Sequence, residues 1–207
     1  MYEPFISSSR TIPHCRRDFA EWHRGISHYG FWAVLVNDRG WLELLRNARS
    51  HVERFLHPGY RRAPHITVAA CGLFSEEHFS TELQRRQTTA LQEAKLQPFF
   101  LNAGVLDSFA SAPYITVEDP EGSLDELRSI LAAISKEDNP ADYKPHITLG
   151  LYRKAFETLS VANHLRKFRS ASTKQLSVTE LAFCVYETSD IQGPFIVVKR
   201  VALAGSG

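Results

Sequence analysis

The chain has few cysteines and no surplus of either charge over its 207 residues. Its three cysteines, Cys15, Cys71 and Cys184, are scattered and odd in number, so they indicate neither a disulfide framework nor a paired metal site. This usage favours a reducing compartment, and we expect a cytoplasmic protein. The formal net charge is +1, which argues against a protein that grips long duplex DNA through many phosphate contacts.

Long apolar runs are also missing from the sequence. No run reaches the length of a membrane-spanning helix, and the N-terminus lacks the apolar stretch of a secretory signal. A P-loop, a G-x-G-x-x-G motif, a G-x-S-x-G elbow and an H-E-x-x-H motif are all absent. The sequence therefore carries no signature of an NTPase, a dinucleotide-binding enzyme, a serine hydrolase or a zinc protease.

One tetrapeptide, Pro-His-Ile-Thr, occurs twice, at residues 64–67 and 145–148, and an apolar residue follows each copy. The two histidines lie 81 positions apart (146 − 65), which suits two copies of a half-domain. In a β-strand, side chains at i and i+2 point to the same face, so each strand would present one imidazole beside one hydroxyl. Two such strands facing each other would gather two histidines and two threonines around one cleft.

These four side chains suit the cleavage of phosphate esters. One imidazole takes a proton while the other gives one, and we favour His146 as base and His65 as acid. The hydroxyls of Thr67 and Thr148 would hold phosphate oxygens. Because the two motifs are nearly symmetric, the sequence leaves the assignment of base and acid open.

Other interpretations of the motifs remain. Chance supplies single H-x-T matches in a chain with nine histidines, and the similar His78-Phe79-Ser80 falls in a predicted helix, where i and i+2 diverge. Each motif histidine could instead be a buried strand residue that a neighbouring hydroxyl satisfies. Zinc is a second alternative, but catalytic zinc has three protein ligands, and no cysteine or carboxylate stands at partnered spacing. We expect no metal and no cofactor.

The hydrophobic pattern predicts alternating strands and helices. Predicted strands cover 31–36, 65–70, 99–109, 114–117, 146–152, 177–187 and 195–203, and predicted helices cover 41–55, 75–96, 123–135 and 155–168. Ser75 and Ser123 are the expected N-caps of the second and third helices. Each half contributes a helix, a motif strand, another helix and a strand pair. The repeat predicts an α+β fold of two pseudo-symmetric lobes, with facing antiparallel sheets and a central cleft that carries both H-x-T motifs.

Residues 1–28 are polar and mixed, and we expect an N-terminal extension that lies mostly outside the core. Residues 29–207 would form a single bilobal domain.

With these features the chain resembles the 2H phosphoesterase superfamily, which includes the bacterial 2'-5' RNA ligase-like proteins and the 2',3'-cyclic nucleotide phosphodiesterases. The resemblance covers about residues 29–203 and includes the prolines before the motifs, the opening strand with its helix and the closing strand pair. The motifs that carry it are His65-Ile66-Thr67-Val68 and His146-Ile147-Thr148-Leu149. It implies that both histidines are catalytic and that both threonines bind the scissile phosphate.

The resemblance also implies an activity. We expect a metal-independent phosphodiesterase acting on a 2',3'-cyclic phosphate or a 2'-5' linkage of a nucleotide or RNA end. The alternative is a non-catalytic module that binds nucleotides or RNA ends. Many ligase-like members carry a basic residue three positions after the second threonine, where this chain has Leu151, followed by Tyr152 and Arg153. This departure leaves the substrate class open.

Further residues are candidates for lining the cleft. Strand alternation places Tyr152 on the face of His146, where it could stack a nucleobase or pack against the core. The same alternation places Cys71, as a small buried thiol, on the face of His65. Phe31 and Trp32 alternate, so we expect one in the cleft and the other in the core. Candidates for added positive potential are Arg61, Arg62, Lys144 and Arg153, and the cluster Trp22-His23-Arg24 is a candidate for closing over the cleft.

The expected partner is a nucleotide or a short single-stranded RNA end, because four motif side chains and a few cations suffice to hold one phosphate. We expect no duplex DNA and no membrane as partners, and a monomeric protein.

Overall fold

The computed structural model describes residues 1–138, 143–169 and 174–204. Within these residues two four-stranded antiparallel sheets form, in the orders β2-β1-β7-β8 and β5-β4-β3-β6. The first sheet contains β1 (His28–Leu35), β2 (His65–Leu73), β7 (Glu180–Glu187) and β8 (Phe195–Ala202). The second contains β3 (Phe99–Ser108), β4 (Pro113–Glu118), β5 (His146–Thr148) and β6 (Gln175–Val178).

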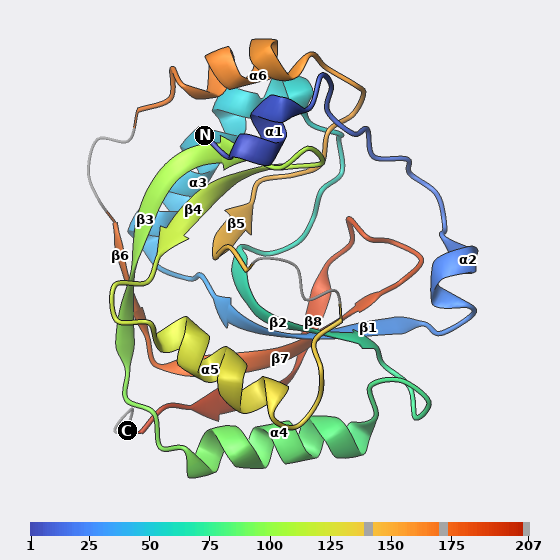
Figure 1. The fold of residues 1–207 in the computed structure, drawn as a ribbon, viewed down its shortest axis with the longest axis vertical. Coiled ribbons are helices and arrows are strands. Elements are labelled where there is room, and N and C mark those ends of the chain that lie inside the picture. The colour runs from blue at the N-terminus through green and yellow to red at the C-terminus, as the bar shows by residue number, and fades with distance from the viewer. Residues whose placement is uncertain (139–142, 170–173, 205–207) are drawn as a thin grey trace.

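Helices cover the two sheets separately, so the molecule has two lobes (Figure 1). On the first sheet, α4 (Thr81–Glu93) contacts β8 and α5 (Ser123–Ala132) contacts β2. On the second, α3 (Arg39–Val52) contacts β4 and α6 (Thr158–Leu165) contacts β3. The expected α+β fold with two lobes is confirmed. No described helix is both long and apolar enough to cross a membrane.

The order of the strands in the sequence suggests that each strand pair joins the sheet of the motif strand before it. In the structure, each pair joins the other sheet. The pair β3–β4 follows the first motif strand, β2, but it pairs with β5, which carries the second motif. The closing pair β7–β8 returns to complete the sheet of β1 and β2. The continuous strand expected over 177–187 is therefore broken at Thr179, because β6 and β7 join different sheets.

One hydrophobic core is continuous through both lobes. It contains the middle residues of the two motifs, Ile66 and Ile147, together with Val68 of the first sheet and Ile115 of the second. Because these apolar side chains point into the core, the histidine and threonine on either side of each isoleucine point away from it. Burial of the isoleucines thus orients both H-x-T motifs outward.

Two helix starts differ from the sequence expectation. The N-cap of α4 is Ser80, whose Oγ accepts from the Leu83 amide at 3.2 Å, and Ser75 lies in the preceding turn. Phe79 is buried against Phe183, and this packing favours a turn over residues 75–79 before the helix. For the same reason the decoy His78-Phe79-Ser80 lies in a turn rather than in the expected helix.

The N-cap of α5 is Gly122, with a positive φ of 72°, instead of Ser123. The carboxylate of Asp119, which precedes the helix, accepts a hydrogen bond from the Leu124 amide at 2.7 Å. This bond satisfies a free N–H of the first turn.

The first 28 residues pack against both lobes. In α1 (Glu3–Ser7), Phe5 is fully buried and belongs to the main core, so the expectation of a segment mostly outside the core is wrong there. The following backbone runs along the second lobe, where Thr11, Ile12 and His14 donate to carbonyls of Phe156, Ala110 and Tyr152. The chain then crosses to the first lobe through α2 (Ala20–His23) and enters β1.

Candidate functional site

Each H-x-T motif lies on an edge strand, and the two edges face each other across the lobes. His65 opens β2 and His146 opens β5, and β2 and β5 are in contact. The Tyr143 hydroxyl donates to the Thr67 carbonyl at 3.0 Å, which ties the residue three positions before His146 to the first motif strand. Tertiary packing therefore brings two motifs 81 positions apart (146 − 65) into one region.

The two imidazoles are held by the same contact. His65 Nδ1 lies 2.8 Å from the Ala63 carbonyl oxygen, and His146 Nδ1 lies 2.7 Å from that of Lys144. A carbonyl oxygen only accepts, so Nδ1 carries the proton in both rings. In the neutral form, Nε2 of each ring keeps a free lone pair and can accept a proton.

Aromatic rings flank both imidazoles. Phe31 and Phe195 lie 5.3 and 5.1 Å from the His65 ring, and Phe109 and Tyr114 lie 4.8 and 5.2 Å from the His146 ring, measured between ring centroids. These rings limit the orientations that each imidazole can take. They also remove water from one side of it, which disfavours the charged form.

Burial lowers the pKa of His65 to about 4, although its hydrogen bond to Ala63 acts in the opposite direction. The positive charges of Arg62 and of protonated His146 lower the pKa of His65 further. Burial also lowers the pKa of His146, and the charge of Lys144 adds to this effect. Both imidazoles are therefore neutral in the free protein at pH 7, and a proton on His146 disfavours one on His65.

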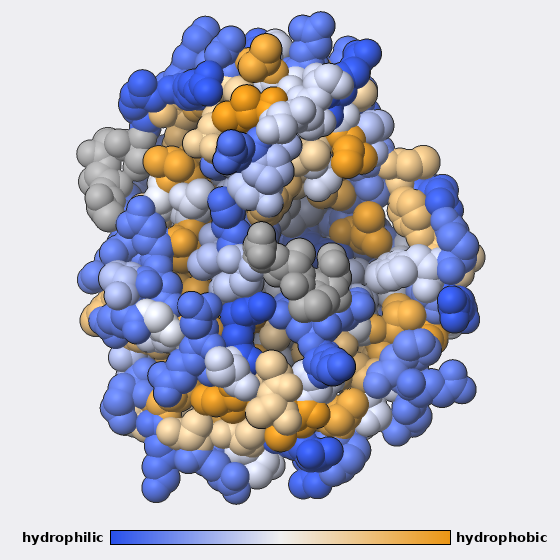
Figure 2. Space-filling model, in the orientation of Figure 1, coloured by the Kyte–Doolittle hydropathy of each residue, from blue (hydrophilic) through white to orange (hydrophobic). Residues whose placement is uncertain are grey.

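A cavity of about 460 Å³ brings residues of both motifs together. It is lined by His65, Thr67, Thr148, Arg62, Phe19, Trp22, Tyr60, Leu151, Tyr186 and Ile191. His146 is not among these residues, but it stands two positions before Thr148 on β5, so its side chain lies on the same side of the strand. Figure 2 shows that this face of the molecule is hollowed between its upper and lower parts.

Phe31 and Trp32 alternate as expected, and neither side chain is open to solvent. Phe31 is 3% exposed and packs beside His65, where it supports the imidazole. Trp32 is fully buried in the core, and its Nε1 donates to Gln87 Oε1 at 2.8 Å. A substrate-binding role for Trp32 is therefore wrong.

The stacking role considered for Tyr152 is wrong as well. Its side chain is fully buried, and its hydroxyl hydrogen-bonds the Ser108 hydroxyl at 2.6 Å. Strand alternation does not reach this residue because β5 ends at Thr148 and Gly150 takes a φ of +153°, which other residues rarely adopt. The chain bends away from the motif face before Tyr152.

Cys71 lies on the core side of β2, opposite His65. Irregularities in the pairing of β1 with β2, one of them between Trp32 and Ala33, shift the alternation along β2. Its thiol contacts Gln87 Oε1 at 3.8 Å, and burial raises the pKa of the thiol, as expected for an inert buried cysteine.

Four basic side chains near the motifs were candidates for lining the cleft, and most of them lie outside the cavity. Lys144 Nζ lies 4.2 Å from the ring of Tyr2, and Arg153 is exposed on the surface. Arg61 pairs with Asp190 at 2.7 Å. Only Arg62 of these four lines the cavity, with its guanidinium 3.7 Å above the Tyr186 ring.

Several cavity residues carry no signal in the sequence. Phe19, Tyr60, Tyr186 and Ile191 reach the cavity because β7 joins β1 and because α2 lies near the first motif. Neither relationship follows from local sequence. Two lining residues could be suspected from the sequence: Arg62, because it is close to His65 in the chain, and Trp22, because it belongs to the cluster Trp22-His23-Arg24.

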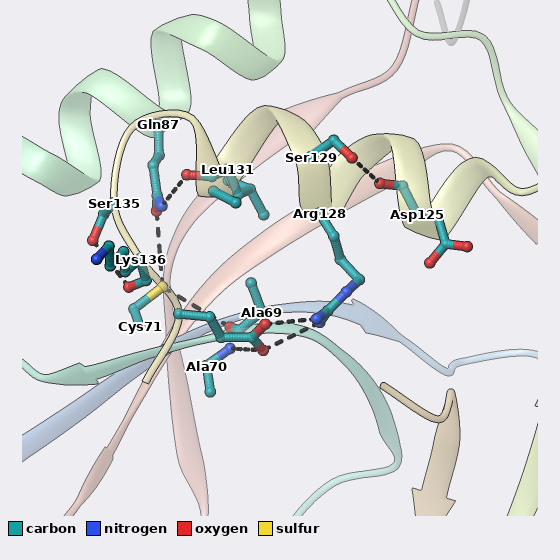
Figure 3. Close-up of a pocket in the computed structure, with 12 residues that line it drawn as sticks. Ala69, Ala70, Cys71, Gln87, Asp125, Arg128, Ser129, Leu131, Ser135 and Lys136 are labelled. Atoms are coloured by element: carbon teal, nitrogen blue, oxygen red, sulfur yellow. Dashed lines mark hydrogen bonds and ion pairs between the residues drawn. The ribbon is translucent and has the colours of Figure 1, made fainter. Parts of the chain in front are cut away.

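A second cavity of about 340 Å³ lies on the other side of β2, toward α5 (Figure 3). Arg128 donates to the Val68 carbonyl at 2.7 Å and pairs with Glu137 at 2.6 Å, and Glu137 accepts from the Ala70 amide at 3.1 Å. This cluster satisfies the free edge of β2 and leaves the motif side chains untouched. Across the described residues, no three or more histidine, cysteine or carboxylate side chains gather as a metal site would need.

Comparisons with known proteins agree with this geometry. Residues 36–190 match the family model of the 2'-5' RNA ligase superfamily. E. coli LigT complexed with 3'-AMP is 18% identical, with a TM-score of 0.58 over 86% of this chain and 98% of that one. TT0787 of Thermus thermophilus is 15% identical, with a TM-score of 0.57 over 86% of this chain and 100% of that one. No curated protein sequence matches the chain.

The fold of two facing sheets is that of the 2H phosphoesterases. The chain belongs to the 2'-5' RNA ligase superfamily, whose model matches residues 36–190, a stretch that includes both motifs. Membership supports phosphoester chemistry in general.

Proposed function

We propose that the protein is a phosphodiesterase that uses His65 and His146 as a general acid–base pair, without a metal. Its substrate is a 2',3'-cyclic phosphate or a 2'-5' linkage at the end of a nucleotide or an RNA. The observation that carries the proposal is the matched setting of the two imidazoles, each with Nδ1 fixed on a carbonyl oxygen two residues earlier. Such fixation leaves each Nε2 available for proton transfer at a phosphate.

In the proposed reaction, one neutral imidazole removes a proton from a water molecule, whose oxygen attacks phosphorus. The bond from phosphorus to the leaving ribose oxygen breaks, and the other, protonated imidazole gives that oxygen its proton. Thr67 and Thr148 hydroxyls donate to the remaining phosphate oxygens. The reaction needs one proton on the pair, and repulsion between the two charged rings favours single protonation.

The matched settings of the two imidazoles fit either assignment of acid and base. Burial lowers the pKa of both histidines, and a proton on His146 disfavours one on His65. A bound phosphate anion raises both pKa values, so one ring can hold the proton that the leaving oxygen receives. We propose the assignment that the sequence favours, with His146 as base and His65 as acid in the hydrolytic direction.

A panel of 2',3'-cyclic, 2'-5' and 3'-5' substrates tests the function with wild-type protein and with His65→Ala and His146→Ala. Each replacement should lower kcat roughly 100- to 10,000-fold on the substrate that the wild type cleaves, the usual range for loss of a general acid or base. His78→Ala is the matched control, because His78 is exposed and stands in the decoy H-x-S sequence.

Two results would contradict the proposed function. Binding of a cyclic nucleotide without turnover of any substrate in the panel would favour the non-catalytic binding module. Activity that disappears in EDTA and returns with zinc would favour a metal mechanism.

A further inference from the structure

The N-terminal segment is anchored on both lobes and spans the region between them. On the second lobe, Thr11 donates to the Phe156 carbonyl at 2.9 Å and His14 donates to the Tyr152 carbonyl at 2.7 Å. On the first lobe, the Ser27 carbonyl accepts from the Thr188 amide at 3.0 Å, just before β1 begins. This segment precedes residue 36, where the family match starts.

The segment supplies two aromatic side chains to the cavity that holds the motif residues. Phe19 and Trp22 both line it, and Trp22 keeps 37% of its surface exposed. Trp22 lies 5.8 Å from the ring of Tyr29, which in turn stacks on Tyr186 at 5.3 Å. A large exposed aromatic at a cavity suits a planar ligand, because the face of any nucleobase can stack on it.

The helix that carries Trp22 is held in place by its neighbour. His23 is 7% exposed, its Nε2 lies 2.6 Å from the Asp18 carboxylate, and its Nδ1 accepts from the Gly25 amide at 3.1 Å. These contacts fix both ends of the short helix α2. The backbone that carries Trp22 is therefore held in a fixed position beside the cavity.

Arg62 forms a polar part of the same cavity. Its guanidinium stacks on Tyr186, and its Nε and Nη2 atoms are buried without a hydrogen-bond partner among the residues that the structure describes. A buried donor without a partner is costly. Arg62 is the one arginine or lysine among the described residues that line the cavity, so its charge favours a phosphate anion there.

We propose that this cavity is a subsite for a single terminal nucleotide, in which Trp22 and Phe19 cover the base and Arg62 holds the phosphate together with the motif threonines. The inference rests on the proposed function and names its substrate: a nucleotide with a free end, whose base contacts a segment outside the family match. The volume of about 460 Å³ lies within the range of small-ligand pockets, as a mononucleotide requires.

Kinetics on two substrates separates the roles of Trp22 and Arg62. The substrates are 2',3'-cyclic AMP and a base-free methyl riboside 2',3'-cyclic phosphate. Trp22→Ala should raise KM for the nucleotide roughly 5- to 150-fold, the range for loss of one stacked base, and should leave KM for the base-free substrate unchanged. Arg62→Met should raise KM for both substrates.

Matched controls exist for both changes. Phe100→Ala removes a similarly exposed aromatic that does not line the cavity, and Arg61→Met removes the neighbouring arginine, which pairs with Asp190. Both controls should leave KM unchanged. An equal rise in KM on both substrates in Trp22→Ala would overturn the base subsite, because the effect would not depend on the base.

A fluorescence titration with 3'-AMP keeps the test independent of turnover. Trp32 and Trp41 are fully buried and do not line the cavity, so we expect quenching of wild-type fluorescence that is lost in Trp22→Phe. If no substrate is cleaved but this quenching occurs, the subsite stands and the hydrolytic function fails. Equal quenching in both proteins, or none in either, would overturn the subsite.

Discussion

The hydroxyl of Tyr143 donates a hydrogen bond to the carbonyl oxygen of Thr67 at 3.0 Å. Tyr143 precedes the second motif, and Thr67 belongs to the first, so this bond joins the two edge strands beside the candidate site. The Arg128 guanidinium lies over the Tyr143 ring, 3.8 Å from its centroid. The relative position of the two histidines therefore depends on side chains outside both motifs.

Replacing Tyr143 by Phe should loosen the alignment of the motifs without removing a reacting group. The change deletes one hydrogen bond, and we expect a loss of about 1 kcal/mol in the free energy of unfolding. Because catalysis depends on how the acid and base are placed, kcat should fall more than KM rises. Urea unfolding and steady-state kinetics measure the two effects, and unchanged kcat would show that this bond does not position the motifs.

The ion pair of Arg128 and Glu137 should stabilise the first lobe more than an exposed pair does. Their side chains are only 18% and 17% exposed, and both also bond the backbone of β2. We expect Glu137→Gln to lower the free energy of unfolding by about 1–3 kcal/mol, less than for fully buried pairs. Glu82→Gln is the control, because Glu82 pairs with Arg85 on the surface, where water and salt screen the pair, so this change should cost less than Glu137→Gln. Equal losses would show that the position at the strand edge adds nothing.

Acid should destabilise the protein through His65. The unfolded histidine titrates near pH 6.5, while burial lowers the folded pKa to about 4. Between these values the unfolded chain binds a proton that folded His65 does not, so the free energy of unfolding falls as the pH falls. The shift corresponds to at most about 3 kcal/mol, lost progressively from about pH 7 to pH 4.

Replacing His65 by Gln should flatten this pH dependence. The test is a series of urea unfolding curves between pH 4 and pH 7, roughly the interval between the two pKa values. His78→Gln should leave the slope unchanged, because His78 is exposed. An identical slope in wild type and His65→Gln would show that this imidazole is not buried as the structure indicates.

Substrates with different leaving groups should show which histidine is the general acid and which is the general base. A p-nitrophenolate leaves without a proton, so loss of the general acid matters less on a p-nitrophenyl phosphodiester than on a ribose phosphodiester. If His65 is the acid, His65→Ala should recover much of its activity on the p-nitrophenyl substrate, whereas His146→Ala should not. The reverse pattern would make His146 the acid and His65 the base.

Binding of oligonucleotides should depend only weakly on salt and on chain length. The net charge of +1 offers no broad basic surface, and the cavity holds one arginine among its lining residues. We expect one to three phosphate contacts, with a slope of roughly 0.7 per contact in log affinity against log salt for single strands. A long and a short oligonucleotide with the same end should bind alike. Much tighter binding and a steeper slope for the long one would reveal an extended RNA-binding surface.

Local patterns in the sequence determined much of the fold. The alternation around Ile66 and Ile147 predicts motif strands with a buried middle residue, and both are buried. Alternation also separates Phe31 from Trp32 onto opposite faces, as observed. These predictions hold because a pleated strand places neighbouring side chains on opposite faces wherever its backbone stays regular.

The errors arose where the backbone is irregular or where a distant contact chooses between local options. Tyr152 and Cys71 follow a bend at Gly150 and shifts in strand register, so counting by twos places both on the wrong face. Ser75 and Ser80 are both plausible helix caps, and the packing of Phe79 on Phe183 selects Ser80.

The sequence by itself determined the two Pro-His-Ile-Thr strands and the chemistry of their side chains, because residue identity and local alternation suffice for both. Only the tertiary structure decided that β3 and β4 join the sheet of the second motif, and that Trp22 and Arg62 meet at one cavity. The physical reason is that hydrogen bonding between strands and the burial of apolar faces join residues far apart in the chain. Many pairings satisfy the same local pattern, and only the packing of the whole chain selects among them.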